Sequence, residues 1–371
     1  MTGGDSPVVL GVLVVVVVVA VLEVAVRIWL RHFASEAQVE KYALITRMEP
    51  RKIRLTPHPY LGYYNTPNYR KGLKSHNSLG YRNDEFPIKK PVGVFRIAVL
   101  GGSTVYTELV EDNAKQFTTQ LENVLSEKFG YANVHVVNAG VPGFTSYESL
   151  VDLALRILDL EPDLVVVYHG TNDCHTRFVA ANAYRGDNSG YRKHWDPPRP
   201  PPWQHLAALR VLSRRLGLSQ QAMLEQFVET PTAEDPTADQ MDLLRAHPPV
   251  FYERNLESTI ALAKHHRVGV MFATWAHSPH LGDYAAEPHY VRCFREMNET
   301  KKRVASRNGI PLFDFAAVMP TDPKYWGDGR HVNEAGALLK AELFAAFMHE
   351  QGLITAAPTT QASPAAARDH A

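Results

Sequence analysis

Residues 95–106 of the chain read FRIAVLGGSTVY. The first six of these residues form a short apolar run, rich in β-branched side chains, that stops at the glycine pair Gly101 and Gly102. A run of this kind predicts a buried β-strand that leads directly into a tight turn. The rest of the fold is organised around this strand, because further strand and helix patterns follow it along the chain.

Ser103 comes directly after the two glycines. A side chain at the carboxyl end of a buried parallel strand lies where open α/β sheets bind their ligands. Glycines just before it allow backbone and substrate to approach closely. The pattern therefore predicts that Ser103 is a catalytic nucleophile.

Helical and strand patterns alternate after this first strand. Apolar residues at helical spacing predict helices over residues 114–129, 147–160, 251–266, 289–308 and 333–349. Short apolar runs without polar alternation predict strands over residues 134–137, 164–168, 268–273 and 311–313. Alternation of this type is typical of a parallel sheet with helices on both of its faces.

The alternation breaks once, over residues 179–250. Residues 196–203, DPPRPPPW, are too rich in proline for regular helix or sheet, whereas apolar spacing predicts a helix over residues 206–228. A connection this long inside a compact domain is usually functional or mobile. Two interpretations stay open, an inserted cap or lid near the site and a surface insertion without a functional role.

Residues 7–31 form the most apolar segment of the chain, interrupted only by Glu23, Arg27 and Arg31. A helix needs about 20 apolar residues to span a bilayer, so this segment predicts a transmembrane helix, with Trp29 as an interfacial anchor. The rival is a cleaved signal peptide. A basic region before the apolar run is missing and the run is long, which favours an uncleaved anchor.

The remaining segments carry weaker patterns. Residues 1–6 are a polar tail, and residues 32–94 form an extension that we expect to pack on the main domain, with a helix over residues 36–48. The main domain spans residues 95–354. Residues 355–371 are rich in Ala, Pro and Thr, which predicts disorder.

Composition excludes several classes of function. The 371 residues include 39 basic and 39 acidic side chains, so no strong net field recruits nucleic acid. The two cysteines, Cys174 and Cys293, form no CxxC motif, which argues against a disulfide scaffold or a zinc site. One disulfide between them stays open, and two free thiols are the favoured reading.

Two later stretches predict hydrogen-bond donors near Ser103. Residues 137–146, VNAGVPGFTS, follow the second strand and contain Gly140 and Gly143, whose backbone N–H groups are able to face a ligand. Residues 168–173, YHGTND, end the third strand and place the amide of Asn172 at the same edge of the sheet. Donors aimed at a developing oxyanion are a large term in catalysis. Taken singly, each stretch also fits an ordinary turn.

A third stretch predicts a general base. Residues 326–334, WGDGRHVNE, contain Asp328 and His331 in a glycine-containing loop just before the last helix. This spacing lets the carboxylate hold one ring nitrogen of the imidazole while the other nitrogen faces a serine. Such a histidine activates a hydroxyl that is unreactive at its own pKa.

In this order, the motifs GGST, NAGVPGFTS, GTND and DGRHVNEAG resemble the four motif blocks of the SGNH (GDSL-like) hydrolase family, over residues 96–348. The resemblance implies a flavodoxin-like three-layer α/β/α sandwich with a mostly parallel sheet of about five strands. It also implies esterase, lipase, thioesterase, deacetylase or acyltransferase activity. One residue departs from the pattern: the family's founding motif has Asp before the serine, where this chain has Gly102.

The resemblance implies roles for five residues. Ser103 matches the nucleophile, Asp328 and His331 match its partners, and Gly143 and Asn172 match the oxyanion-hole donors, together with the N–H of Ser103. The implied reaction is cleavage of an acyl or acetyl ester through an acyl-enzyme. It needs no cofactor and no metal. The implied substrates are small-molecule, lipid or acylated glycan esters.

Several alternatives stay open from the sequence. An O-acyltransferase acting on an envelope glycan would use the same residues, and a non-catalytic membrane-tethered binding protein would share the fold. A phosphate loop at GGST is disfavoured, because no GxGxxG or GxxxxGK[ST] pattern follows the first strand. A metal site at His169, Asp173 and His175 is disfavoured by their spacing.

Two observations disagree about the side of the membrane on which the main domain lies. Basic residues follow the apolar segment, which by charge bias places the main domain in the cytoplasm. Anchored members of the family that the chain resembles are commonly outside the cytoplasm. The tail before the segment has only six residues and few charges, so the charge bias has a small effect. We therefore expect an extracytoplasmic main domain.

Overall fold

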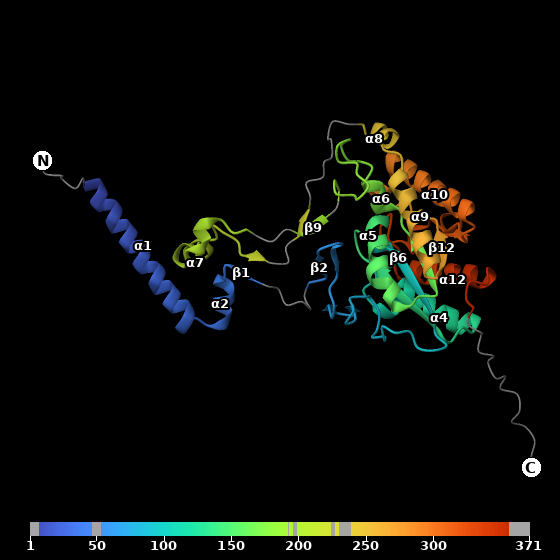
Figure 1. Ribbon diagram of the computed structural model, residues 1–371, viewed down its shortest axis with the longest axis horizontal. Helices are drawn as coiled ribbons and strands as arrows, with labels where there is room; N and C mark the ends of the chain where they lie inside the picture. Colours follow the sequence, from blue (N-terminus) through green and yellow to red (C-terminus); the bar gives the residue numbers. More distant parts are fainter. Residues whose placement is uncertain are drawn as a thin grey trace, which may run out of the picture. The chain divides into compact units, whose positions relative to one another are not determined.

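The computed structural model describes residues 7–46, 53–191, 193–195, 199–223, 227–229 and 239–355. The chain divides into two compact units (Figure 1). The smaller unit comprises Met1–Glu49 and His194–Val228, and the larger unit comprises Pro50–Lys193 and Glu229–Ala371. The division falls inside the predicted extension 32–94 and inside the predicted insertion 179–250.

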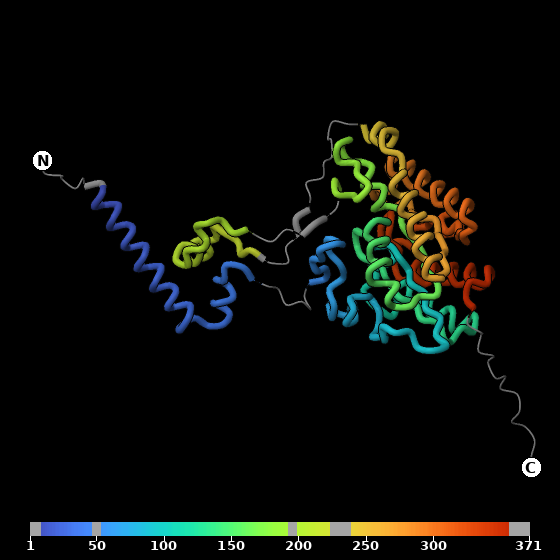
Figure 2. Tube along the Cα trace, in the orientation of Figure 1, coloured from blue at the N-terminus to red at the C-terminus, as the bar shows by residue number. Residues whose placement is uncertain are grey.

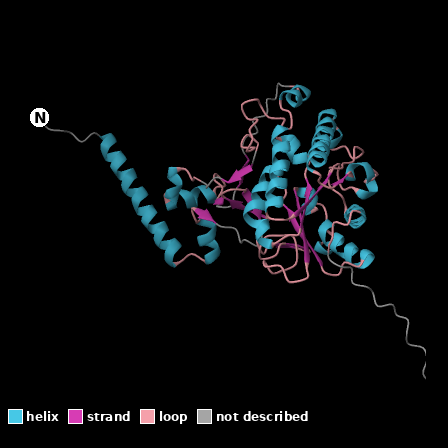
Figure 3. Cartoon of the chain, turned by 45° about the vertical axis from the view of Figure 1, so that its right-hand side comes forward, coloured by secondary structure: helices cyan, strands magenta, loops and turns pink. Residues whose placement is uncertain are grey.

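The larger unit is built on a five-stranded sheet, which Figure 3 shows between its helices. The strands are β6 (Phe95–Gly101), β7 (Val134–Gly140), β8 (Leu164–Tyr168), β12 (Gly269–Ala273) and β13 (Leu312–Phe313). They lie in the order β13-β12-β8-β6-β7, and every neighbouring pair is parallel. This is the flavodoxin-like order, and it confirms the fold class predicted from the sequence.

Helices cover both faces of the sheet. On one face, α4 (Phe117–Phe129) packs against α12 (Glu334–Glu350). On the other face, α5 (Ser146–Asp152), α9 (Val250–His265) and α10 (Pro288–Asn308) pack side by side (Figure 1). Shorter helices complete this unit: α3 (Ser103–Tyr106), α6 (Thr171–His175), α8 (Gln240–Ala246) and α11 (Phe315–Val318).

The apolar sequences of the central strands are explained by burial on both faces of the sheet. Every residue of β6 and of β8 is buried, which explains why neither strand shows a polar alternation. Their register brings three loops together, because Gly101 at the end of β6 lies opposite Gly140 of β7 and Tyr168 of β8. The stretches that follow these three strands therefore meet at one edge of the sheet.

Two small hairpins precede β6 in the larger unit. They are β2 (Leu55–His58) with β3 (Gly62–Asn65), and β4 (Arg70–Lys71) with β5 (Lys74–Ser75). Residues 53–94 pack on the main domain: the Tyr63 hydroxyl donates to the Pro142 carbonyl at 2.8 Å, and Asn65 Nδ2 donates to the Gly140 carbonyl at 2.9 Å. Both bonds reach the loop that follows β7.

The smaller unit joins two distant parts of the chain, coloured blue and yellow-green in Figure 2. Its elements are α1 (Pro7–His32), α2 (Glu36–Tyr42), β1 (Ile45–Thr46), α7 (Ala207–Arg215) and β10 (Ala222–Met223). β1 and β10 pair in parallel. Strands β9 (Lys193–Trp195) and β11 (Phe227–Glu229) pair with each other.

The α1 helix is long and apolar enough to cross a bilayer, over Val9–His32. Its length and composition, together with its place near the N-terminus, fit both a membrane anchor and a signal sequence. Cys174 and Cys293 both lie in the larger unit, where they are buried and free.

Two helix predictions were wrong in length. The helix predicted over 206–228 ends at Arg215, because Gly217 adopts a left-handed conformation with φ +69° and Phe227 belongs to β11. The helix predicted over 36–48 ends at Tyr42, where Ala43 becomes extended and leads into β1. The predictions for residues 1–6 and 356–371 lie outside the described residues.

Candidate active site

Ser103 lies at the sharp turn from β6 into α3. Gly102 caps the helix, and Ser103 is its first residue, so the Ser103 N–H is one of the helix N–H groups without an intrahelical acceptor. The turn requires glycine at Gly101, because a Cβ atom there would lie 2.3 Å from Val105 Cγ2 and 2.6 Å from the Tyr168 carbonyl oxygen. The Ser103 side chain is partly exposed.

Asp328 and His331 lie in a tight loop that is closed by a bridge between Trp326 and Val332. One carboxylate oxygen of Asp328 accepts from the backbone N–H groups of Arg330 and His331, both at 2.7 Å. The other oxygen is 2.8 Å from His331 Nδ1. The loop backbone thus orients the carboxylate, and the carboxylate orients the imidazole.

The environment of Asp328 keeps it ionised. Partial burial alone would raise its pKa, but the hydrogen bond and charge of His331 and the two backbone N–H groups outweigh burial and lower the pKa to about 2. An ionised carboxylate at this position holds the proton of His331 on Nδ1.

The opposite ring nitrogen of His331 faces the serine. His331 Nε2 is 2.7 Å from Ser103 Oγ, although the two residues are 228 positions apart in the chain. The structure therefore brings Ser103, His331 and Asp328 into one hydrogen-bonded chain. This geometry lets a hydroxyl transfer its proton to an imidazole that is held by a carboxylate.

Gly143 lies in the loop after β7, where the carbonyl oxygen of the next residue, Phe144, would be 3.2 Å from a Cβ atom at Gly102. Gly143 is exposed and has φ +85°, a conformation that favours glycine. Among the described residues, neither the Gly143 N–H nor the Ser103 N–H has a protein acceptor. By contrast, the Gly140 N–H already donates to Asn138 Oδ1 at 3.0 Å, so it is not available to a ligand.

Asn172 lies in α6, after β8, and its side-chain amide approaches Gly102, the residue before Ser103. Its Nδ2 donates to the Phe144 carbonyl at 2.8 Å and retains a second N–H. A Cβ atom added at Gly102 would lie 2.4 Å from this Nδ2 atom. The glycine that departs from the family's founding motif therefore makes room for the present position of Asn172.

Sequence reasoning missed Tyr63, which comes from the β2–β3 hairpin. Its hydroxyl fills the space next to Gly143: a Cβ atom at Gly143 would lie 2.3 Å from it. Together with its bond to the Pro142 carbonyl, this contact braces the loop that carries the Gly143 N–H. No motif could have revealed it, because a tyrosine among several in a turn-rich segment carries no distinctive signal.

Polar residues near Asn172 bond to other parts of the fold. Asp173 accepts from the Ser146 hydroxyl at 2.6 Å, and His169 Nε2 is 2.8 Å from Ser149 Oγ. His175 lies between two tyrosine hydroxyls, at 3.1 and 2.9 Å. Within the described ranges, no group of three or more His, Cys, Asp or Glu side chains is placed to hold a metal ion.

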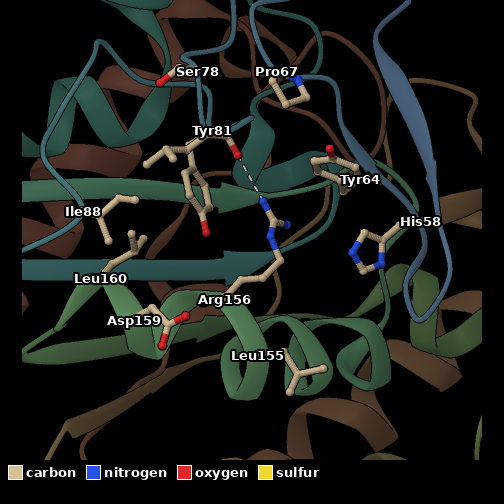
Figure 4. Close-up of a pocket in the computed structure, with 11 residues that line it drawn as sticks. His58, Tyr64, Pro67, Ser78, Tyr81, Ile88, Leu155, Arg156, Asp159 and Leu160 are labelled. Atoms are coloured by element: carbon tan, nitrogen blue, oxygen red, sulfur yellow. Dashed lines mark hydrogen bonds between the residues drawn. The ribbon is translucent and has the colours of Figure 1, made fainter.

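A separate pocket lies on the other face of the β2–β3 hairpin (Figure 4). Tyr64 lines it, because successive side chains of a strand point to opposite faces. Arg156 reaches across it and donates to the Leu79 carbonyl at 3.1 Å. Ser103 and His331 are not among its lining residues, so it does not belong to the candidate active site.

A flavodoxin-like sheet with serine, glycine, asparagine and histidine at its carboxyl edge defines the SGNH class of hydrolases. The model of the GDSL-like Lipase/Acylhydrolase family matches residues 99–339. The chain therefore belongs to this family, as its four motif blocks predicted.

Comparison with solved structures gives likenesses at low identity. The lipase/acylhydrolase from Enterococcus faecalis is 18% identical, with a TM-score of 0.43, over 70% of this chain and 97% of that chain. A GDSL-like lipase from Bacteroides thetaiotaomicron is 16% identical, with a TM-score of 0.38, over 70% and 92%. The acetyl xylan esterase AlAXEase is 15% identical, with a TM-score of 0.42, over 68% and 98%. Among curated proteins, no sequence matches this chain.

Proposed function

We propose that the protein is a serine esterase that cleaves an acyl or acetyl ester through an acyl-enzyme. The observation that carries the proposal is the chain of contacts from Asp328 through His331 to Ser103, with N···O distances of 2.8 and 2.7 Å. Family membership supports the general reaction, and the geometry supports the assignment of roles to these residues.

In the acylation step, Ser103 Oγ attacks the carbonyl carbon of the ester and His331 Nε2 takes the hydroxyl proton. The carbonyl oxygen becomes an oxyanion, which accepts hydrogen bonds from the N–H groups of Ser103 and Gly143 and from the Asn172 amide. Asp328 stabilises the imidazolium cation that forms. The intermediate then expels the alcohol, which receives its proton from His331, and leaves the acyl group on Ser103.

In the deacylation step, water enters where the alcohol left. His331 takes a proton from this water as its oxygen attacks the acyl carbon. The second oxyanion uses the same three donors. Its collapse breaks the bond to Ser103, returns the proton to Oγ and releases the carboxylic acid. A glycan hydroxyl in place of water would turn the same sequence into O-acyl transfer.

Hydrolysis of p-nitrophenyl acetate, butyrate and palmitate by the full chain in detergent tests this proposal. Wild-type protein should release nitrophenolate, and Ser103→Ala should lower kcat by at least ~10⁴-fold with an unchanged circular dichroism spectrum. Asn172→Ala should lower kcat by ~10²–10³-fold, the usual effect of removing one oxyanion donor. Equal activity of Ser103→Ala and wild type would overturn the assignment.

We also infer that α1 is an uncleaved single-pass anchor and that the main domain lies outside the cytoplasm. The apolar length of α1 supports an anchor, and its contacts with α7 in the folded unit support its retention. Intact-mass analysis of membrane-extracted protein should therefore include residues 1–32. A carboxyl-terminal alkaline phosphatase fusion should be active; activity only of a cytoplasmic reporter would overturn the orientation.

A further inference from the structure

The segment 199–223, which interrupts the catalytic domain in sequence, folds on α1. α7 packs along one side of α1, where the partly buried residues Val19, Glu23, Val26 and Leu30 recur at helical spacing. Ala207 and Val211 of α7 are buried within the smaller unit. The contact is therefore a packed helix pair.

An acidic side chain inside the apolar helix fixes the position of α7. The Glu23 carboxylate accepts from the backbone N–H groups of Ala207 at 2.9 Å and Ala208 at 2.8 Å, and from Arg27 Nε at 2.6 Å. A carboxylate in an apolar helix is costly unless it is paired. Here the first turn of α7 and Arg27 satisfy it.

The arginines of α7 point toward α1 and α2. Arg210 Nε donates to the Tyr42 carbonyl at 2.8 Å, and Arg214 donates to the carbonyls of Lys41 and Ala43 at 2.8 and 2.7 Å. The guanidinium of Arg215 lies 5.7 Å from the ring centroid of Trp29. α7 thus extends from the level of Glu23 to the level of Trp29 on α1, with its cations at the end of the apolar segment.

The remaining face of the segment is apolar and exposed. We call it the leucine face, and it consists of Trp203 (40% exposed), Leu206 (37%), Leu209 (38%), Leu212 (54%), Leu216 (62%) and Leu218 (75%). Leu206, Leu209 and Leu212 recur at three-residue spacing, which keeps them on one side of the helix. Leu212, Leu216 and Leu218 are each more than half exposed.

We propose that the leucine face lies in the apolar edge of a lipid bilayer, so that the insertion is a second membrane contact beside α1. Its surface is continuous with that of α1, whose apolar side chains are also exposed along the candidate span, such as Val16 at 58%. Helices with an apolar face and arginines on the other side are typical of the membrane interface. Trp29 and Trp203 are the aromatic residues expected there.

A bilayer fits this surface better than a protein partner. The same lipid that must cover α1 also reaches a helix packed against α1 at the level of Glu23. The exposed Arg31 in the last turn of α1 matches anionic headgroups at the interface. The proposal rests on the anchor inferred above and is independent of the esterase chemistry.

A fluorescent label on the leucine face tests the proposal. The full-length variants Leu212→Cys and Leu216→Cys carry an exposed thiol, whereas Cys174 and Cys293 are buried and do not react in the folded protein. Each variant is labelled with an NBD maleimide and reconstituted into phosphatidylcholine–phosphatidylglycerol vesicles. Val16→Cys in α1 is the embedded control, and Glu350→Cys at the exposed end of α12 is the aqueous control.

We expect nitroxide-labelled lipid to quench the Leu212 and Leu216 labels at least ~2-fold, with little quenching by iodide in water. The Val16 label should behave in the same way, and the Glu350 label should show the reverse pattern. Quenching of the Leu212 label by iodide would overturn the proposal. Shielding from both quenchers would also overturn it, because a protein partner or a second copy would then cover the face.

The two controls separate the failure of the anchor from the failure of the second contact. If lipid quenches Val16 but not Leu212, the anchor stands and the proposal for the leucine face fails. If lipid does not quench Val16, α1 is not embedded and both fail. Esterase activity is not a readout in either case.

Discussion

At the scale of single residues, the candidate site depends on the absence of a side chain at Gly102. The family's founding motif has a carboxylate before the nucleophile, whereas Gly102 leaves room for Asn172 Nδ2 at a place that a Cβ atom would approach within 2.4 Å. The nearest backbone atom to such a Cβ is the Phe144 carbonyl oxygen, at 3.2 Å. A side chain here must therefore displace Asn172 or the loop that follows β7.

Gly102→Ala should consequently lower kcat by ~10²-fold with a smaller change in KM, because the Cβ atom displaces the Asn172 amide from its present position. The effect acts through Asn172, so the double variant with Asn172→Ala should be no slower than Asn172→Ala alone. Steady-state kinetics of the three variants measure this. Multiplicative losses in the double variant would show that Gly102 acts independently of Asn172.

Asp328 offers a second test at this scale. With its pKa lowered to about 2, this carboxyl stays ionised throughout the pH range of an ordinary assay. Asp328→Asn keeps the shape but removes the charge and favours the wrong imidazole tautomer, so kcat at neutral pH should fall by ~10⁴-fold. If the variant were as active as the parent, another group would orient His331.

At the scale of elements, the sequence predicted the strands and helices of the sheet better than the segments that brace them. The strands can be recognised from the sequence because burial on both faces requires continuous apolar runs, as in β8. The partners of α7 leave no local signal: the bonds to Glu23 span 184 and 185 residues. The predicted helix over 206–228 was too long for a different reason, since apolar spacing alone does not mark the turn at Gly217.

The β2–β3 hairpin is an element whose role only the structure reveals. Tyr63 points to the loop of Gly143, whereas its neighbour Tyr64 lines the pocket in Figure 4. Tyr63→Phe removes the hydrogen bond to the Pro142 carbonyl and loosens the Gly143 N–H donor. We expect kcat to fall ~5–10-fold, the equivalent of about 1 kcal/mol, with KM nearly unchanged.

Tyr64→Phe is the matched control on the same strand and should retain wild-type kcat. Ester hydrolysis and thermal unfolding of both variants decide the matter. Equal losses in the two variants, or a rise of KM with kcat unchanged in Tyr63→Phe, would mean that the hairpin acts on stability or on substrate access instead of on the oxyanion.

At the scale of the whole molecule, the larger unit buries several histidines in their neutral form. Burial lowers the pKa of His76, His135 and His175 to about 4 and that of His169 to about 3. The unfolded chain binds these protons near pH 6.5, whereas the folded chain does not. Between pH 6.5 and about 4 these four groups therefore make stability fall as the pH falls.

Three buried acids act in the opposite direction. Burial raises the pKa of Asp173 to about 7 and also raises the pKa of Glu122 and Asp152, so these carboxyls bind a proton more readily in the folded chain than in the unfolded chain. Even if all three stay protonated, the four histidines leave a net uptake of about one proton on unfolding at pH 5. One proton corresponds to ~1.4 kcal/mol per pH unit.

The full chain in detergent should therefore unfold at a lower temperature at pH 5 than at pH 6. Near-ultraviolet circular dichroism during heating measures the midpoint at each pH. The slope with pH should be positive across this interval. A midpoint that is higher at pH 5 would contradict the balance of buried histidines and acids.

Much of the larger unit could be predicted from sequence, because its strands, its helices and the spacing of Asp328 and His331 are local patterns. The contact between His331 and Ser103, 228 residues apart, was inferred from the resemblance of the four motif blocks and from the rule that parallel strands end at one edge. The packing of the smaller unit could not be predicted, because its two parts are joined by backbone hydrogen bonds and arginine contacts that no periodicity encodes.

The central claim is that His331 activates Ser103. Labelling of the full chain in detergent with a fluorophosphonate probe tests it most directly, followed by mass mapping of the modified residue. We predict one label on Ser103 and its loss in His331→Ala, with the fold intact in both proteins. A folded wild-type protein that stays unlabelled, or equal labelling of His331→Ala, would contradict the claim.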